Sequence, residues 1–129
     1  MNVEQLSELV HETLSRYRVL IGETAHPSWT EAGDDMRSST RKNVTAHLDA
    51  LASGRPLAAS HSHDKWMEER KGAGWVYGVP RDNAMKIHPS LVPYEQLPMN
   101  ERLKDHILNG LCLAYHNALM ETAKPAETV

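Results

Sequence analysis

Apolar side chains recur at every third or fourth position over three long stretches of the chain, which is the spacing of an amphipathic α-helix. The first stretch covers residues 3–21 and ends before Gly22, a residue type that commonly follows a helix. The second begins after Asp34 or Asp35, either of which predicts an N-terminal cap, and it ends at Ser53 and Gly54. The third covers residues 99–120 and follows Pro98. The pattern therefore predicts a protein dominated by helices.

Between residues 56 and 98 the pattern changes to short segments separated by glycine and proline. Ser62 predicts the cap of a short helix over residues 63–71. Residues 75–78 and 85–88 are β-prone, and the turn-forming residues 80–83 predict an antiparallel hairpin between them. The expected fold class is mainly α with this small antiparallel β-hairpin, in a single compact domain of residues 1–120. Residues 121–129 are expected to form a flexible tail.

The last predicted helix carries apolar side chains on two faces. One stripe contains Leu103, Ile107, Gly110, Leu111, Ala114 and Ala118, and the other contains Leu108, Cys112, Tyr115 and Leu119. A helix that is apolar over most of its circumference is central to the fold or is covered by a second subunit. The sequence predicts a homodimer through this helix, and the alternative is that the first two helices cover both stripes within one chain.

The charge balance narrows the classes of partner. The 129 residues include 14 Lys and Arg against 17 Asp and Glu, a net charge of −3, so no basic excess supports binding to nucleic acid. Apolar runs are too short to span a membrane, and the N-terminus lacks the pattern of a signal peptide. With one cysteine, no intramolecular disulfide is expected either. A soluble cytoplasmic protein that contacts neither nucleic acid nor membrane is the expectation.

Catalytic and metal-binding motifs are missing from the sequence. There is no Gly-x-Ser-x-Gly elbow, no phosphate-binding Walker loop and no cysteine pair, and Cys112 lies on an apolar helical stripe. His61, His63 and Asp64 form a short His-x-His-Asp cluster, but the spacing of a zinc site is lacking, and His63 is expected to orient the start of the short helix. We therefore expect neither catalysis nor a metal or cofactor.

Residues 62–105 carry the most specific pattern in the chain. The informative positions, in order, are Trp66, Gly74-Trp75-Val76-Tyr77-Gly78, Arg81-Asp82, Lys86, His88-Pro89, Leu91, Pro93-Tyr94, Leu97 and Lys104-Asp105. Together they closely resemble the ryanodine receptor repeat domain, the RyR domain. The N-terminal half is similar to small stand-alone relatives from bacteria and their phages, through Leu9-Val10-His11-Glu12, Gly22 and Pro27-Ser28-Trp29. The resemblance thus extends over nearly the whole chain.

This resemblance implies helices packed around a small hairpin and no established catalytic chemistry. Prokaryotic members of the family have been proposed to bind nucleotide-derived ligands, including in antiviral signalling. The expected function is therefore a non-catalytic binding module for an adenine nucleotide, an ADP-ribose-type compound or a cyclic nucleotide. It would act as a sensor or as a sequestering sponge, in the host cytoplasm if a phage encodes it. The alternative is a protein-interaction or structural module without a small-molecule ligand.

A ligand-binding site is expected between the hairpin and the polar second helix. Its expected members are Trp75, Tyr77, Arg81, Lys86, His88, Arg37, Arg41 and Lys104. Strand alternation places Trp75 and Tyr77 on one face for stacking on a base, and likewise places Lys86 and His88 together toward phosphate or ribose oxygens. Arg81 adds a bidentate contact, and the two arginines of the second helix close the site. The alternative is that the basic residues are structural and that Lys104 pairs with the hairpin turn.

Overall fold

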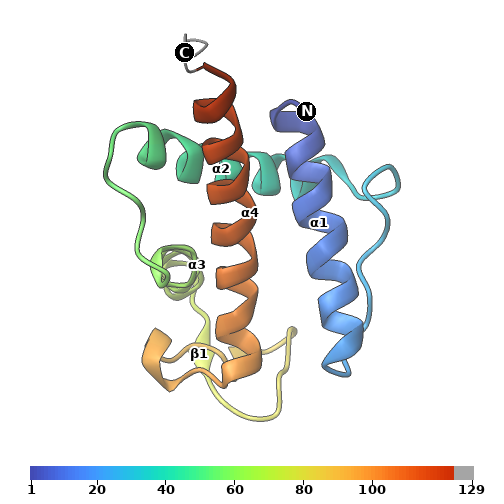
Figure 1. The fold of residues 1–129 in the computed structure, drawn as a ribbon. Helices are drawn as coiled ribbons and strands as arrows, with labels where there is room; N and C mark the ends of the chain where they lie inside the picture. The colour runs from blue at the N-terminus through green and yellow to red at the C-terminus, as the bar shows by residue number, and fades with distance from the viewer. Residues whose placement is uncertain (124–129) are drawn as a thin grey trace, which may run out of the picture. The chain divides into compact units, whose positions relative to one another are not determined.

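The computed structural model describes residues 1–123, which form four α-helices, two short strands and one 3-10 helix (Figure 1). Their order is α1 (Val3–Leu20), α2 (Asp34–Ala52), α3 (His61–Gly72), β1 (Val76–Tyr77), β2 (Ile87–His88), η1 (Tyr94–Gln96) and α4 (Met99–Ala123). The chain divides into a helical unit, Met1–Leu57 with the chain from His106 onward, and an insert unit, Ala58–Asp105. Helix α4 contributes to both units. The predicted mainly helical fold class is confirmed.

Helix α1 has the boundaries that its sequence predicts. A capping box fixes its start, because the Asn2 side chain accepts from the Gln5 N–H at 2.9 Å and the Gln5 side chain accepts from the Asn2 N–H at 2.9 Å. The helix ends at Leu20, and Gly22 follows in the left-handed region with φ of 87°.

The N-cap of helix α2 lies one or two residues before the predicted caps, Asp34 or Asp35. Gly33 is the N-cap residue, so Asp34 and Asp35 lie in the first turn rather than at the cap. Their carboxylates still favour this end of the helix, because the first turn carries the positive end of the helix dipole. The predicted end at Ser53 and Gly54 is confirmed.

The core of the helical unit is built by three helices. Its buried members are Leu6 and Val10 of α1, Val44 of α2, and Leu108 and Cys112 of α4. In Figure 1, α2 runs across α1 and the C-terminal part of α4. Burial raises the pKa of the Cys112 thiol to about 11, so the thiol stays protonated at neutral pH. Leu108, Cys112 and Tyr115 of one predicted stripe thus pack within the chain, whereas Leu119 of the same stripe is exposed. Of the other stripe, Leu111 packs against the core, and Leu103, Ala114 and Ala118 are exposed.

The insert unit begins with α3, whose cap is Ser60 and not the predicted Ser62, which lies inside the helix. The helix is closed by a turn in which Gly74 has φ of 90° and the Trp75 N–H donates to the Arg70 carbonyl at 3.0 Å. Trp75 therefore leaves the end of α3 directly into β1.

The predicted antiparallel hairpin is wrong in the direction of its strands. Val76 pairs with Ile87 and Tyr77 with His88 in a parallel register. A single turn at residues 80–83 would have made the strands antiparallel. Instead Asp82 forms an antiparallel bridge with Ile87, at 3.0 and 2.9 Å, so the chain reverses twice and β2 returns in the direction of β1.

The C-terminal boundary also differs from the prediction. Helix α4 continues to Ala123, so residues 121–123 of the predicted flexible tail are helical, and residues 124–129 lie outside the described residues. Within residues 1–123, none of the helices combines the length and the apolar content needed to cross a membrane.

Candidate ligand-binding site

Four aromatic rings gather in the insert unit. The His88 ring of β2 meets Trp66 of α3 edge to face, with 4.9 Å between ring centroids, and lies 6.3 Å from Trp75. On the other side of this group the His63 ring stacks on Trp66 at 5.5 Å. We call His63, Trp66, Trp75 and His88 the aromatic cluster. It connects α3, the residue before β1, and β2.

The two histidines of the cluster have defined proton positions. The His63 ring is buried, and its Nε2 donates to the Val92 carbonyl at 2.7 Å, which ties the segment after β2 to α3. The Nδ1 of His88 accepts from the Ser90 N–H at 3.0 Å, so the proton of the neutral ring is on Nε2. Burial lowers the pKa of His88, and the nearby positive charges lower it further.

Arg70, Arg81 and Lys86 of the insert unit are in no ion pair with a carboxylate of the described residues. The Arg70 guanidinium lies 5.0 Å from the Trp75 ring and 6.0 Å from the Trp66 ring. Arg81 donates from Nε to the Asn83 side chain at 3.0 Å, and Lys86 donates from Nζ to the Ala73 carbonyl at 2.7 Å. Within residues 1–123, no carboxylate oxygen lies within 4.0 Å of these charged groups. We call Arg70, Arg81 and Lys86 the insert cations.

The structure separates the predicted roles of Lys86 and His88. Lys86 precedes β2 and has φ of 56°, so strand alternation does not place it on the His88 face. Its ammonium instead binds the carbonyl of Ala73, the C-cap residue of α3, which uses one of its three N–H donors. His88 lies in the aromatic cluster. The two residues therefore meet different surroundings, and the expected paired grip on one phosphate does not follow from the strand.

The two predicted stacking residues differ in exposure. Trp75 is half-buried against Arg70 and the aromatic cluster, whereas 59% of Tyr77 is exposed. Stacking on a ligand requires an open ring face, so Tyr77 is the more accessible of the two.

The remaining predicted residues are engaged elsewhere. Lys104, in the insert unit, pairs with Glu101 within α4 at 3.1 Å. Arg37 and Arg41 belong to the helical unit and have partners within it. Arg37 donates to the Trp29 carbonyl at 3.1 Å and to Asp34 at 2.6 Å.

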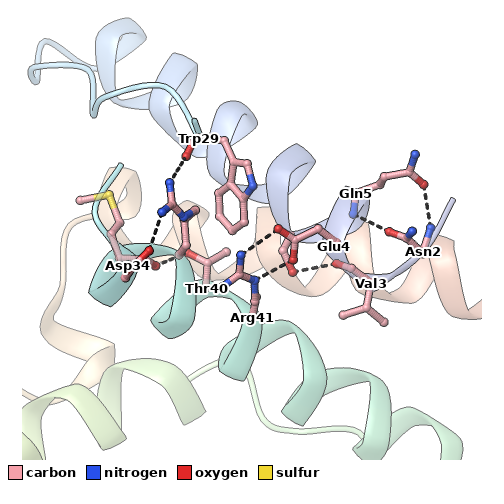
Figure 2. A network of polar contacts seen from close by, with 11 residues as sticks. Asn2, Val3, Glu4, Gln5, Trp29, Asp34, Thr40 and Arg41 are labelled. Carbon is pink, nitrogen blue, oxygen red and sulfur yellow. Dashed lines mark hydrogen bonds and ion pairs between the residues drawn. The ribbon is translucent and has the colours of Figure 1, made fainter. Parts of the chain in front are cut away.

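Figure 2 shows the pair that Arg41 forms with Glu4, through two hydrogen bonds of 2.6 and 2.8 Å. The Arg41 guanidinium also lies 5.3 Å from the Trp29 ring. The hydrogen bonds from Arg41 lower the pKa of the Glu4 carboxyl, so this pair is charged at neutral pH. These contacts connect α1, α2 and the loop before α2, which is a structural role within the helical unit.

Sequence reasoning missed Arg70. This residue follows Trp66 by four positions in a predicted helix, and side chains at that spacing share a helix face. That spacing was the available signal for an arginine beside the aromatic cluster. The positive charge of Arg70 also lowers the pKa of His88, as does the charge of Arg81.

The sequence model of the RyR domain matches residues 38–115, more than half of the chain. This protein belongs to the RyR domain family. The match includes the whole insert unit and continues into α2 and α4 on either side, so the RyR domain comprises parts of both units. The resemblance given by residues 62–105 is thereby confirmed. Among residues 1–123 of this RyR domain, no three His, Cys, Asp or Glu side chains are grouped so as to hold a metal ion.

Proposed function

We propose that this RyR domain is a non-catalytic module that binds a nucleotide-derived ligand through its insert unit. The observation that carries the proposal is that Arg70 lies beside the half-buried Trp66 and Trp75 rings and that no carboxylate of the described residues pairs with any of the insert cations. An anion with a flat ring fits both features, because phosphate oxygens pair with guanidinium groups and a base stacks on an aromatic face. The ligand classes are an adenine nucleotide, an ADP-ribose-type compound or a cyclic nucleotide.

Three of the predicted residues keep their proposed roles in the insert unit. Tyr77 stacks on the base, and Arg81 and His88 face the phosphate or ribose oxygens. Trp75 supports the stacking surface from its half-buried position. We also assign the protein to the cytoplasm and to the small stand-alone type of bacteria and phages. There it would sense or sequester a signal in antiviral defence.

Thermal unfolding with a panel of ADP-ribose, ATP, AMP and cyclic AMP tests the proposal. A ligand present at a hundred times its Kd stabilises the folded state by about 2.7 kcal/mol, which is a clear rise in Tm. In Arg81→Ala this rise should disappear, while the Tm without ligand changes by only about two degrees because the side chain is exposed. Arg55→Ala, at an exposed loop position of the helical unit, is the matched control and should keep the full rise.

Lys86→Ala is the less direct variant for this purpose. Because the Lys86 ammonium binds the carbonyl at the end of α3, its removal should lower the Tm without ligand as well as the affinity. A panel in which no compound raises the Tm of the parent protein would contradict the proposed function.

A protein-interaction module is the second candidate, and one observation favours it. The exposed fractions around β1 are large for apolar side chains: 56% for Val76, 73% for Val79 and 69% for Met85. Apolar groups gathered on a surface are typical of protein-binding sites. This function predicts no thermal shift with any nucleotide, and a partner whose binding is lost in Val79→Ser but kept in Arg81→Ala.

We further propose a homodimer through α4. The support is the exposure of apolar side chains on the part of α4 in the helical unit, 45% for Leu113, 44% for Leu119 and 49% for Met120. Light scattering at high micromolar concentration tests this assembly. A mass equal to one chain would contradict it.

A further inference from the structure

Two arginines lie beside tryptophan rings in the described part of the chain, and only one of the two has a carboxylate partner there. Arg41 lies over the Trp29 ring, and Glu4 closes its guanidinium with two hydrogen bonds of 2.6 and 2.8 Å. Arg70 lies over the Trp75 ring at a similar distance, 5.0 Å against 5.3 Å. No carboxylate of the described residues reaches it within ion-pair distance. The helical unit therefore contains a complete arrangement of ring, guanidinium and oxyanion, and the insert unit contains the same arrangement without the oxyanion.

We infer that Arg70 is an oxyanion-binding residue and that a phosphate group of the ligand takes, on Arg70, the place that Glu4 takes on Arg41. The inference rests on the proposed nucleotide-binding function, and it adds a residue and a ligand group to that site. The edge of a guanidinium presents two parallel N–H donors to two oxygens of one phosphate. A guanidinium that lies face-on over an indole ring keeps this edge available, because the ring then contacts the face of the cation and not its N–H groups.

The surroundings of Arg70 favour an anion over a neutral group. Arg81 and Arg70 both lower the pKa of His88, so both positive charges lie near that ring. Because no carboxylate of the described residues is in an ion pair with either arginine, an anion bound beside the ring gains from both charges. A phosphate carries enough oxygens to accept from Arg70 and Arg81 at the same time.

The test is an NMR titration of the unmodified protein with sodium pyrophosphate at constant ionic strength, observing the Nε–Hε signals of the arginines. The Arg70 signal is expected to shift in a saturable way, whereas the Arg41 signal, closed by Glu4, stays in place. Arg41 is thus the control within the same molecule. A saturable shift confined to other arginines would overturn the inference. So would an equal shift with malonate, which offers carboxylates in place of phosphates.

Two variants give a second readout. Arg70→Gln removes the charge and both parallel donors, and should weaken pyrophosphate binding by about tenfold or more. Arg70→Lys keeps the charge but loses the two-point contact, so an intermediate loss is expected. Circular dichroism checks that both variants fold, and the NMR titration of the parent decides the matter if one does not. Unchanged affinity in a folded Arg70→Gln variant would overturn the inference.

The failure of this inference and of the proposed function give different results. If a nucleotide raises the Tm of the parent and of Arg70→Gln equally, the role of Arg70 is overturned and the nucleotide function stands. If pyrophosphate shifts the Arg70 signal and no nucleotide raises the Tm, the oxyanion site stands and the nucleotide function is overturned.

Discussion

The side chains around Trp29 in the helical unit form hydrogen bonds and an ion pair with partners in the same unit. His11 donates from Nε2 to the Pro27 carbonyl at 2.6 Å, and its ring meets Trp29 with 5.6 Å between centroids. Arg41 lies over the same tryptophan and is neutralised by Glu4. The charge of Arg41 and the Nε2 donor of His11 thus both have partners within the unit, and these contacts fix the loop before α2.

The insert unit uses the same residue types with a different outcome. His63 donates from Nε2 to the Val92 carbonyl at 2.7 Å, its ring stacks on Trp66, and Arg70 lies 6.0 Å from that ring. The arginine lacks a carboxylate among the described residues. In both units a buried histidine donates to a backbone carbonyl and packs against a tryptophan, and this contact has a structural role. The arginine decides whether the group is closed or open to an anion.

The largest expected loss of stability comes from removing the buried histidine of either unit. His63→Ala removes a buried ring and leaves the Val92 carbonyl without its donor, so the free energy of unfolding should fall by about 2–4 kcal/mol. His11→Ala should cost a similar amount in the helical unit. Urea unfolding measures both, and His106→Ala, at an exposed position, is the control within about 0.5 kcal/mol of the parent. If only one of the two substitutions lowers the free energy of unfolding, the two buried histidines do not have the same structural role.

A second variant acts on the insert unit alone. A Cβ at Gly78 would lie 2.5 Å from the Ile87 Cγ2, so in Gly78→Ala the Ile87 side chain or the β1–β2 pairing has to shift. The expected loss is about 1–3 kcal/mol in urea unfolding, as for other overpacked positions. Gly72→Ala is the matched control, because nothing lies within 4 Å of its added methyl, and a helix-favouring alanine should change stability by at most about 1 kcal/mol. Equal stability of the two variants would mean that the β1–β2 pairing does not hold the insert unit together.

Local signals predicted most of the helices but not the direction of the strands. Apolar spacing and glycine placed α1 and α2 within a residue or two of their ends. The strand direction depends on hydrogen bonds between Asp82 and Ile87 and on the left-handed Lys86. Neither feature can be predicted from the pattern of apolar and polar residues. Turn-forming residues indicate that the chain reverses, but they do not indicate how many times it reverses.

The candidate site could be predicted only in part. The sequence indicated that the basic and aromatic residues of residues 75–88 belong to one site, and these residues lie in one unit. It did not indicate which cations are neutralised, because that depends on partners far apart in the chain. Glu4 and Arg41 are 37 positions apart, so the engagement of Arg41 could not be read from the neighbours of either residue. The expected joint site with Arg37 and Arg41 stays a prediction.

The smallest expected effect is a pH dependence of stability that arises from His88 in the insert unit. The pKa of His88 lies below its ordinary value of 6.5, through burial first and then through Arg81, Arg70 and His63. Between the two values the unfolded chain binds a proton that the folded chain does not, so the free energy of unfolding falls as the pH drops below about 6.5. The fall ends below the pKa of the folded state. Protonation also costs the acceptor that Nδ1 provides for the Ser90 N–H.

His88→Gln should therefore flatten the change in unfolding free energy between about pH 6.5 and the pKa of the folded state, as measured by urea unfolding at several pH values. The His88 ring signal in NMR, followed against pH, gives that pKa directly. Saturating pyrophosphate should raise it, because an anion on the insert cations cancels the positive charge that opposes protonation. A pKa of His88 at or above 6.5 without an anion would contradict both the burial of the ring and the unneutralised positive charges beside it. The difference between the two units would then lose this support.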